Sequence, residues 1–260
     1  EFAKAHFEEA VRCISHLRYD VLENFNFTIF LYEKNPAELK ELLDRYHLPL
    51  VNLYHSYSGV QSNDDYYYEL RERTCKMLSY LGAKTLNIQP GMWRDRPFER
   101  EMDRDVLDQY VKRFTKMGKI ARDYGVQACM HPHGQTHIFH EDEIDYMIDH
   151  LDTDLVKLAL DTGHTTLAGM DAVKAFDKYG DLIAYVHLKD ANPNVDFDPD
   201  WPLHRLHALG QGTVDFQGVL RSLKKHNYDG VLCVEADYPL ICNYETAQYC
   251  RNYCQDVLHI

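Results

Sequence analysis

The sequence lacks the long apolar runs and the basic clusters that mark two large classes of protein. No apolar stretch in its 260 residues approaches the about 20 residues that a membrane helix needs. No basic face stands out, and the formal net charge is −13, whereas proteins that bind duplex nucleic acid usually present a basic surface. The composition therefore predicts a chain that partners neither a membrane nor a nucleic acid.

Paired cysteines are also missing. The chain has seven Cys, an odd number, and no CxxC motif. This pattern is typical of a protein of the reducing cytoplasm rather than of a disulfide scaffold. Cys129 and Cys233 lie within short apolar runs, where cysteine behaves as a small hydrophobic residue. We therefore expect a cytoplasmic protein with free thiols.

No internal repeat, low-complexity linker or early glycine-rich phosphate loop is present. The rival fold of an open doubly wound sheet would normally carry such a loop after an early strand. Gly210-Gln211-Gly212 comes late in the chain and is a weak phosphate motif. With 45% hydrophobic residues, the chain can bury a full core, and its length suits one domain. We expect residues 1–260 to form a single domain.

What the sequence does contain is a set of short apolar runs that recur between helix-like stretches. Six of these runs end in a polar or metal-capable residue: His55, Gln89, His131, Asp161, His187 and Glu235. Strands that alternate with helices predict a parallel sheet. The carboxyl ends of such strands form one mouth, where a (β/α) barrel keeps its chemistry. The pattern thus predicts an α/β fold of the (β/α)8 barrel type, a TIM barrel.

Hydrophobic spacing, Pro and Gly place the elements of this barrel. Helices are predicted at residues 6–16, 36–46, 64–81, 101–124, 141–151, 171–179 and 216–226, and from 244 onward. Strands are predicted at residues 19–23, 47–55, 83–89, 126–131, 156–161, 182–187 and 230–235, and residues 189–212 as a long loop. A barrel of this type has eight strands, so its first strand is expected either upstream of residue 1 or missing.

Asp161, His187 and Glu235 each end a separate predicted strand, so a barrel would direct all three toward its axis. A mixed set of imidazole and carboxylate ligands suits Mn²⁺, Fe²⁺, Co²⁺ or Zn²⁺ better than Ca²⁺. The alternative is that each strand-end carboxylate caps the next helix. Three such residues at strand ends favour a metal site, with His131 or water as a further ligand.

Four further side chains are candidates for catalysis. His133 follows His131 by two residues, so one ring of the pair could bind metal while the other transfers protons; the alternative is a structural pair. His164 lies just beyond Asp161, and Lys189 lies two positions after His187, where it could stabilise an enolate oxygen. The fourth is His207, in the predicted long loop. Glu23, His55 and Gln89 are weaker candidates from the early strands.

Four ordered motifs resemble the sugar phosphate isomerase/epimerase superfamily of xylose isomerase-like barrels. They are Leu160-Asp161-Thr162-Gly163-His164, Val186-His187-Leu188-Lys189-Asp190, Leu209-Gly210-Gln211-Gly212-Thr213-Val214-Asp215-Phe216 and Val234-Glu235-Ala236-Asp237. Within the superfamily the chain is most similar to inosose dehydratases and to the larger subunit of bacterial C-glycoside deglycosidases. The resemblance implies a divalent metal, commonly Mn²⁺, and enolisation of a keto-sugar.

The resemblance also implies four metal ligands in the order Glu, Asp, His, Glu. Asp161, His187 and Glu235 match the last three, and His131 stands where the first Glu is expected. This departure argues against the epimerases, which move one proton between two faces with a Glu pair. It also leaves the fourth ligand open between His131 and water.

We therefore expect a metal-dependent lyase or isomerase that acts on a small keto-sugar or cyclitol by α-proton abstraction. The alternatives are a sugar (phosphate) isomerase or epimerase, and a non-catalytic carbohydrate-binding barrel subunit. A DNA-repair nuclease is disfavoured by the acidic charge. Barrels of this kind usually associate, so we expect a homo-oligomer, with assembly around a small second subunit as an alternative.

Overall fold

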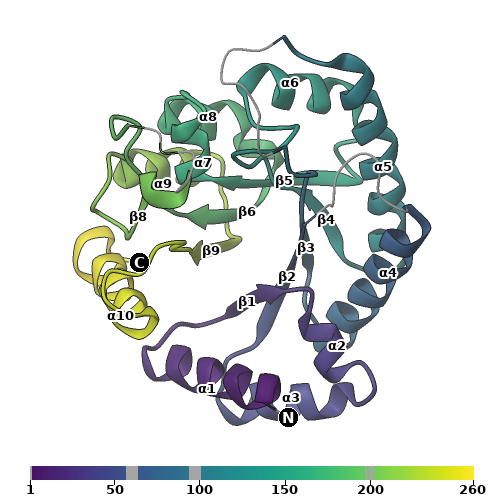
Figure 1. The fold of residues 1–260 in the computed structure, drawn as a ribbon, viewed down its shortest axis with the longest axis vertical. Coiled ribbons are helices and arrows are strands. Elements are labelled where there is room, and N and C mark those ends of the chain that lie inside the picture. Colours follow the sequence, from purple (N-terminus) through teal and green to yellow (C-terminus); the bar gives the residue numbers. More distant parts are fainter. Residues whose placement is uncertain (1, 57–63, 94–100, 197, 199–201) are drawn as a thin grey trace.

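The computed structural model describes residues 2–56, 64–93, 101–196, 198 and 202–260. Its main feature is a parallel sheet of seven strands in the order β1-β2-β3-β4-β5-β6-β9, with helices around its outer side (Figure 1). The strands are β1 Leu22–Phe25, β2 Leu50–Ser56, β3 Thr85–Gln89, β4 Gln127–Met130, β5 Val156–Asp161, β6 Ile183–Leu188 and β9 Val231–Val234. The predicted α/β TIM barrel is confirmed, with seven strands among the described residues.

Helices connect successive strands and cover the outside of the sheet (Figure 1). They are α1 Phe2–His16, α2 Thr28–Tyr32, α3 Pro36–Arg45, α4 Asp64–Leu81, α5 Arg104–Asp123, α6 Glu141–His150, α7 Thr162–Leu167, α8 Ala172–Tyr179, α9 Phe216–Lys225 and α10 Asn243–Tyr253. Short 3-10 turns occur at Gly180–Leu182 and Pro202–Arg205, and a π turn at Cys254–Leu258 follows α10. Aspartate side chains cap α5, α8 and α9 by accepting a backbone N–H of the first turn.

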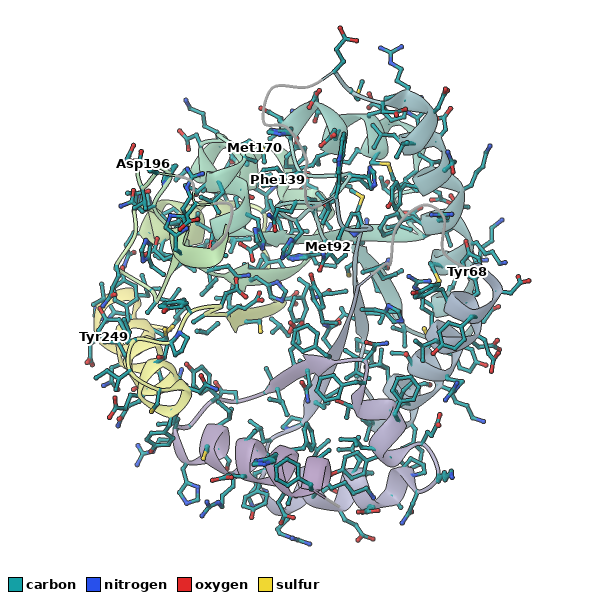
Figure 2. All side chains as sticks on the ribbon, in the orientation of Figure 1. Tyr68, Met92, Phe139, Met170, Asp196 and Tyr249 are labelled. Atoms are coloured by element: carbon teal, nitrogen blue, oxygen red, sulfur yellow. The ribbon has the colours of Figure 1, made fainter. Side chains whose placement is uncertain are left out.

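Two hydrophobic layers hold the barrel together. The larger layer lies between sheet and helices and includes Leu53, Leu86, Met117 and Phe176; Figure 2 shows side chains filling this space. A smaller cluster of Cys129, Ala159 and Tyr185 projects from the other face of strands β4, β5 and β6. Because successive side chains of a strand face opposite ways, these strands are buried on both faces.

Within the described part of the chain, no strand joins β1 to β9, so the sheet is open between its first and last strands. A pocket of about 570 Å³ lies between β1 and β9, lined by residues that include Leu22, Glu23, Val231 and Leu232. The four residues of β9 are only half-buried, in contrast to the buried ends of β5 and β6. The pocket and the two free strand edges mark the position that an eighth strand takes in a closed barrel.

Three sequence expectations need correction. Residues 189–212 are not one structureless loop, because β7 Asp190–Ala191 pairs antiparallel with β8 Leu206–His207. Helices α2 and α7 were not expected; α7 begins directly after Asp161, with no intervening loop. Strand β1 begins three residues later than the predicted residue 19 and runs to residue 25. Consequently Glu23 lies inside the strand rather than at its end.

Candidate metal centre

Backbone pairing brings four predicted site residues to one edge of the sheet. Asp161, the last residue of β5, pairs directly with His187 of β6. The next residue after β9, Glu235, donates its N–H to Leu188 O at 3.0 Å. His131, directly after β4, donates its N–H to Ile88 O at 3.0 Å. The ladder of parallel strands therefore continues through these positions and places the four side chains at the carboxyl mouth.

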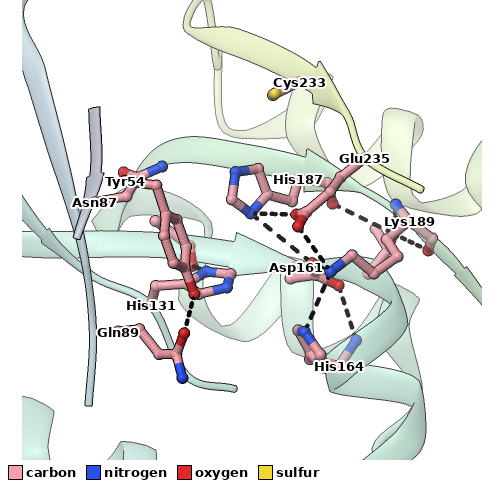
Figure 3. A network of polar contacts seen from close by, with 12 residues as sticks. Tyr54, Asn87, Gln89, His131, Asp161, His164, His187, Lys189, Cys233 and Glu235 are labelled. Carbon is pink, nitrogen blue, oxygen red and sulfur yellow. Dashed lines mark hydrogen bonds and ion pairs between the residues drawn. The ribbon is translucent and has the colours of Figure 1, made fainter. Parts of the chain in front are cut away.

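Each of these four residues offers one buried ligand atom that makes no hydrogen bond with any described residue. The atoms are His131 Nε2, Asp161 Oδ2, His187 Nδ1 and Glu235 Oε2. His187 Nδ1 is 3.1 Å from Glu235 Oε2 and 3.8 Å from Asp161 Oδ2 (Figure 3). Ligand atoms of His131, Asp161 and His187 all lie within 4.8 Å of one another. Buried polar atoms normally have partners, and a single cation bonded at about 2.0–2.3 Å fits such spacings.

The two imidazole rings are oriented so that the unpaired nitrogen faces this group. His131 Nδ1 lies 3.0 Å from Ala159 O, a carbonyl that can only accept, so Nδ1 carries the proton and Nε2 keeps its lone pair. Burial also lowers the pKa of His131 well below its usual range, which keeps the ring neutral. On the other ring, His187 Nε2 contacts Glu23 Oε1 at 2.7 Å, which leaves Nδ1 toward Asp161 and Glu235.

Lys189 is fully buried beside the four atoms. Its Nζ lies 2.8 Å from Asp237 Oδ2, 3.1 Å from Glu235 Oε1 and 3.5 Å from Asp161 Oδ2. Burial by itself would lower the pKa of Lys189, but these carboxylates raise it well above its usual range. The close approach of α7 requires Gly163, where a Cβ would lie 2.9 Å from Lys189 Cγ. The site therefore holds a permanent positive charge next to the candidate ligands.

Opposing effects set the pKa values of the two carboxylates. Burial raises the pKa of Asp161 to about 6, although Lys189 acts in the opposite direction. Burial likewise acts to raise the pKa of Glu235, but Lys189 and His187 hold it well below its usual range. Glu235 is therefore the carboxylate that stays ionised most readily.

His133 and His164 face each other at the edge of the group, with ring centroids 3.7 Å apart. His133 Nδ1 lies 2.6 Å from Gly134 O, so that nitrogen carries the proton and Nε2 is the basic atom. Burial, and then the charge of Lys189, lower the pKa of His133 to about 4. His164 Nε2 lies 3.3 Å from Lys189 Nζ, and its backbone N–H donates to Asp161 Oδ1. Both rings are thus neutral at neutral pH and close to the candidate ligands.

His207 lies away from this constellation. It belongs to β8, where it pairs with Asp190, and among the described residues it makes no hydrogen bond or ion pair with the four ligand atoms. The Gly210-Gln211-Gly212 segment, which is a weak phosphate motif in the sequence, has a structural role. Asp190 Oδ2 accepts the N–H groups of Gly210 and Gly212, each at 2.8 Å. A Cβ at Gly212 would lie 2.3 Å from Asp190 Oδ1, which explains the glycine.

Several polar neighbours of the site carried little or no sequence signal. Asp237 contacts Lys189, while Asn52 and Asn87 contact Glu23. Tyr54 packs edge-on against His131 with ring centroids 5.3 Å apart, and it donates to Gln89 Oε1 at 2.6 Å (Figure 3). Asn52 and Asn87 lie within β2 and β3, so they were visible only as polar interruptions of apolar strands, whereas Gln89 was already a weaker candidate at the end of its strand.

Two other groups of potential ligands occur among the described residues, and both are less suited to a cation. His131, His133 and His164 form one, but the rings of His133 and His164 already have hydrogen-bond partners. Glu23, His187 and Cys233 form the other, on the far side of the His187 ring. There Glu23 is already hydrogen-bonded, and burial raises the pKa of the Cys233 thiol, which keeps it protonated.

Comparison with known proteins confirms the resemblance seen in the sequence. Residues 15–249 match the family model described as "Xylose isomerase-like TIM barrel". An inosose dehydratase of Clostridium beijerinckii is 27% identical over 249 residues, which cover 86% of this chain and 82% of that protein. An inosose dehydratase of Clostridium perfringens is 33% identical over 201 residues, 69% of this chain and 67% of that protein.

Solved structures share the fold at lower identity. A zinc-bound IolI protein superposes with a TM-score of 0.76 and 20% identity, covering 97% of this chain and 92% of that chain. The probable 3-DHS dehydratase AsbF of Bacillus anthracis gives a TM-score of 0.77 and 15% identity, covering 96% and 93%. A xylose isomerase-like barrel of Mycobacterium smegmatis in complex with magnesium gives 0.78 and 19%, covering 97% and 88%. Across the described ranges, no helix combines the length and apolar character that a membrane crossing requires.

Proposed function

Because the chain belongs to the xylose isomerase-like TIM barrel family, we propose that it is a divalent-metal-dependent lyase that dehydrates a keto-sugar or keto-cyclitol. One observation carries the proposal: ligand atoms of His131, Asp161 and His187 lie within 4.8 Å of one another, Glu235 Oε2 lies 3.1 Å from His187 Nδ1, and the four strand-end residues each keep a buried atom that no described residue hydrogen-bonds. The names of the curated relatives support dehydration of a keto-inositol. The chain is an enzyme, as are these relatives, so the non-catalytic alternative is set aside.

The ligands of the cation would be His131, Asp161, His187 and Glu235. Two imidazole nitrogens and two carboxylate oxygens suit Mn²⁺, and also Zn²⁺, Co²⁺ or Fe²⁺. When bound, such a cation supplies Lewis acidity that polarises a substrate carbonyl and acidifies the adjacent C–H. His131 takes the fourth ligand position in preference to water, because its Nε2 is buried and already lacks a hydrogen-bond partner.

The base in this proposal is His133. Its basic Nε2 is unprotonated at neutral pH, and the ring is half-buried, so it borders the space that a substrate would enter. Nε2 takes the proton from the carbon beside the carbonyl, and the electrons of that C–H bond move into the enolate. General-base assistance of this kind contributes about 10²–10⁴-fold in rate.

Lys189 stabilises the negative charge that develops on the enolate oxygen. Its ammonium group is preorganised by Asp237 and Glu235, so little reorganisation accompanies the reaction. In the second step the enolate re-forms the carbonyl and a carbon–carbon double bond while the C–O bond to the β hydroxyl breaks. The proton that His133 has taken passes to the departing hydroxide through the adjacent His164 ring, whose centroid lies 3.7 Å from that of His133, and the hydroxide leaves as water. His133 gains one proton in the first step and gives it up in the second, so its protonation state is restored and the net products are an enone and water.

His207, the remaining predicted catalytic residue, has no role in this scheme. The cytoplasmic location, the homo-oligomer and the small second subunit stay predictions from the sequence.

A substrate screen tests the proposed function directly. Purified protein with Mn²⁺ is incubated with keto-inositols and 3-oxo-glycosides, and the ultraviolet absorbance of the enone is recorded. We expect turnover of at least one compound, loss of turnover in excess chelator and recovery after Mn²⁺ is restored. Turnover that persists unchanged in chelator contradicts the proposal, and release of an epimer without an enone identifies an isomerase instead.

A matched pair of variants tests the assignment of the base. His133→Asn should lower kcat by about 10²-fold or more, the scale of general-base assistance. His150→Asn is the control, because His150 is an exposed residue of α6 whose ring contacts the Tyr146 carbonyl. Equal activity of the two variants excludes His133 as the base.

A further inference from the structure

The far side of the His187 ring makes a contact that the proposed reaction leaves unexplained. His187 Nε2 lies 2.7 Å from Oε1 of Glu23, which comes from β1 at the opposite end of the strand order. The His187 side chain is 0% exposed and the Glu23 side chain 11% exposed. A carboxylate in such a place is costly unless it is paired and hydrogen-bonded. The position of the Glu23 carboxylate therefore indicates that it acts on His187.

Two asparagines hold the Glu23 carboxylate in place. Asn52 Nδ2 in β2 donates to Glu23 Oε2 at 2.5 Å, and Asn87 Nδ2 in β3 donates to the same oxygen at 3.0 Å. The orientation of the Asn52 amide is fixed, because its Oδ1 accepts the backbone N–H of Asn87 at 3.0 Å. Asn52 can therefore only donate toward Glu23. This arrangement leaves Glu23 Oε1 directed at His187.

We propose that Glu23 is a positioning residue for the metal centre, which fixes the proton of His187 on Nε2 and directs the Nδ1 lone pair at the cation. Histidines that bind metals generally donate their other N–H to a carboxylate or carbonyl, which sets the tautomer and the ring orientation. His131 uses the Ala159 carbonyl in the same way. The inference rests on the metal site of the proposed function, but not on the identity of the substrate.

The substitution Glu23→Gln tests this geometry. A Gln side chain has one acceptor group and one donor group at its end. Asn52 can only donate, so the introduced oxygen faces Asn52 and the introduced NH₂ faces His187. His187 Nε2 must then accept a hydrogen bond, which moves its proton to Nδ1 and into the position of the cation. Loss of such a partner typically weakens metal affinity about 10–100-fold.

The measurement is the dissociation constant for Mn²⁺, and separately for Zn²⁺, by competition with a chelating dye, with no substrate present. We expect Glu23→Gln to bind both ions about 10–100-fold more weakly than the wild type. Thermal unfolding in chelator checks that the variant folds. Glu143→Gln is the matched control, because Glu143 is also a buried carboxylate that accepts two hydrogen bonds, from the N–H groups of Phe139 and His140. Its affinity should equal that of the wild type.

The double variant Glu23→Gln/Asn52→Asp separates a positioning role from general damage to the fold. The carboxylate introduced at position 52 still accepts the backbone N–H of Asn87. It can also accept a hydrogen bond from the NH₂ group of the Gln side chain at position 23. The oxygen of that Gln side chain then faces His187 and accepts the Nε2–H. Asn87 can rotate its amide, because its buried Oδ1 has no hydrogen-bond partner to lose. We expect the double variant to bind metal within a few-fold of the wild type.

Each outcome decides the inference. Wild-type affinity in Glu23→Gln, or a double variant as weak as the single one, overturns it, whatever the activity. Absence of metal binding by the wild type overturns the inference and the metal centre together. If the wild type binds metal but converts no keto-sugar or keto-inositol, the proposed function fails, while the affinities still decide the role of Glu23.

Discussion

The two carboxylate oxygens of Asp161 have separate roles, so two substitutions of this residue should have different effects. Oδ1 caps helix α7 by accepting the His164 N–H at 2.8 Å. Oδ2 has no hydrogen-bond partner and faces His187 Nδ1 at 3.8 Å. Asn is as good a helix cap as Asp but lacks the anionic ligand atom, whereas Ala lacks both. We expect Asp161→Asn and Asp161→Ala to lose metal binding and activity alike, and to differ in stability.

The expected changes in stability come from the loss of the α7 N-cap and from the stabilisation that bound metal gives to the folded protein. In chelator, Asp161→Ala should be about 1 kcal/mol less stable than Asp161→Asn, the typical value of an N-cap. Metal at 100 times its dissociation constant should stabilise the wild type by about 2.7 kcal/mol and neither variant. For a chain of this size, each kcal/mol shifts the Tm by roughly 2–4 °C. Urea and thermal unfolding with and without Mn²⁺ measure both effects. A metal-induced shift in Asp161→Asn equal to that of the wild type would refute the reasoning.

Three further changes test other parts of the account. Lys189→Met should lower kcat by about 10²–10³-fold, which is the typical effect of removing one group that stabilises charge in the transition state. The metal content, measured by mass spectrometry, should stay unchanged. A kcat within ten-fold of the wild type would exclude the role of Lys189 toward the enolate. Gly212→Ala should destabilise the protein by about 1–3 kcal/mol in urea, because its Cβ would overlap Asp190; unchanged stability would contradict this. The hydrogen bond to Asp181 raises the pKa of His226 in the folded protein. The His226–Asp181 ion pair therefore stabilises the fold at low pH, and this stabilisation is lost as the pH rises through the raised pKa of His226. The Tm difference between the wild type and His226→Asn should therefore be larger near pH 5.5 than near pH 9, and an equal difference would count against the ion pair.

The sequence predicted those parts of the structure that local pattern controls. Strand β5 and helix α4 begin and end at the predicted residues, because apolar runs and a following Gly or Asp mark their limits. The sequence also led us to expect His131, Asp161, His187 and Glu235 at one edge of the sheet, because parallel strands end at the same edge. The strand-end position was therefore the signal that pointed to these four residues.

Features that depend on contacts between distant segments were not predicted. The β7–β8 hairpin is held by Asp190, which accepts backbone N–H groups from residues about 20 positions away, and no local pattern encodes this. Glu23 was a weak candidate, because its partner His187 is 164 residues distant and its amide donors depend on the register of three strands. His207 stays a prediction; it lies in β8, and among the described residues it makes no hydrogen bond with the four ligand atoms.

The central claim is that one cation is bound by four side chains at the mouth of the barrel. Anomalous diffraction from crystals of the Mn²⁺- or Zn²⁺-loaded protein tests it directly. The account predicts one strong peak within about 2.0–2.3 Å of His131 Nε2, Asp161 Oδ2, His187 Nδ1 and Glu235 Oε2. No peak among these atoms, or a peak between Glu23 and Cys233 on the far side of the His187 ring, would contradict it.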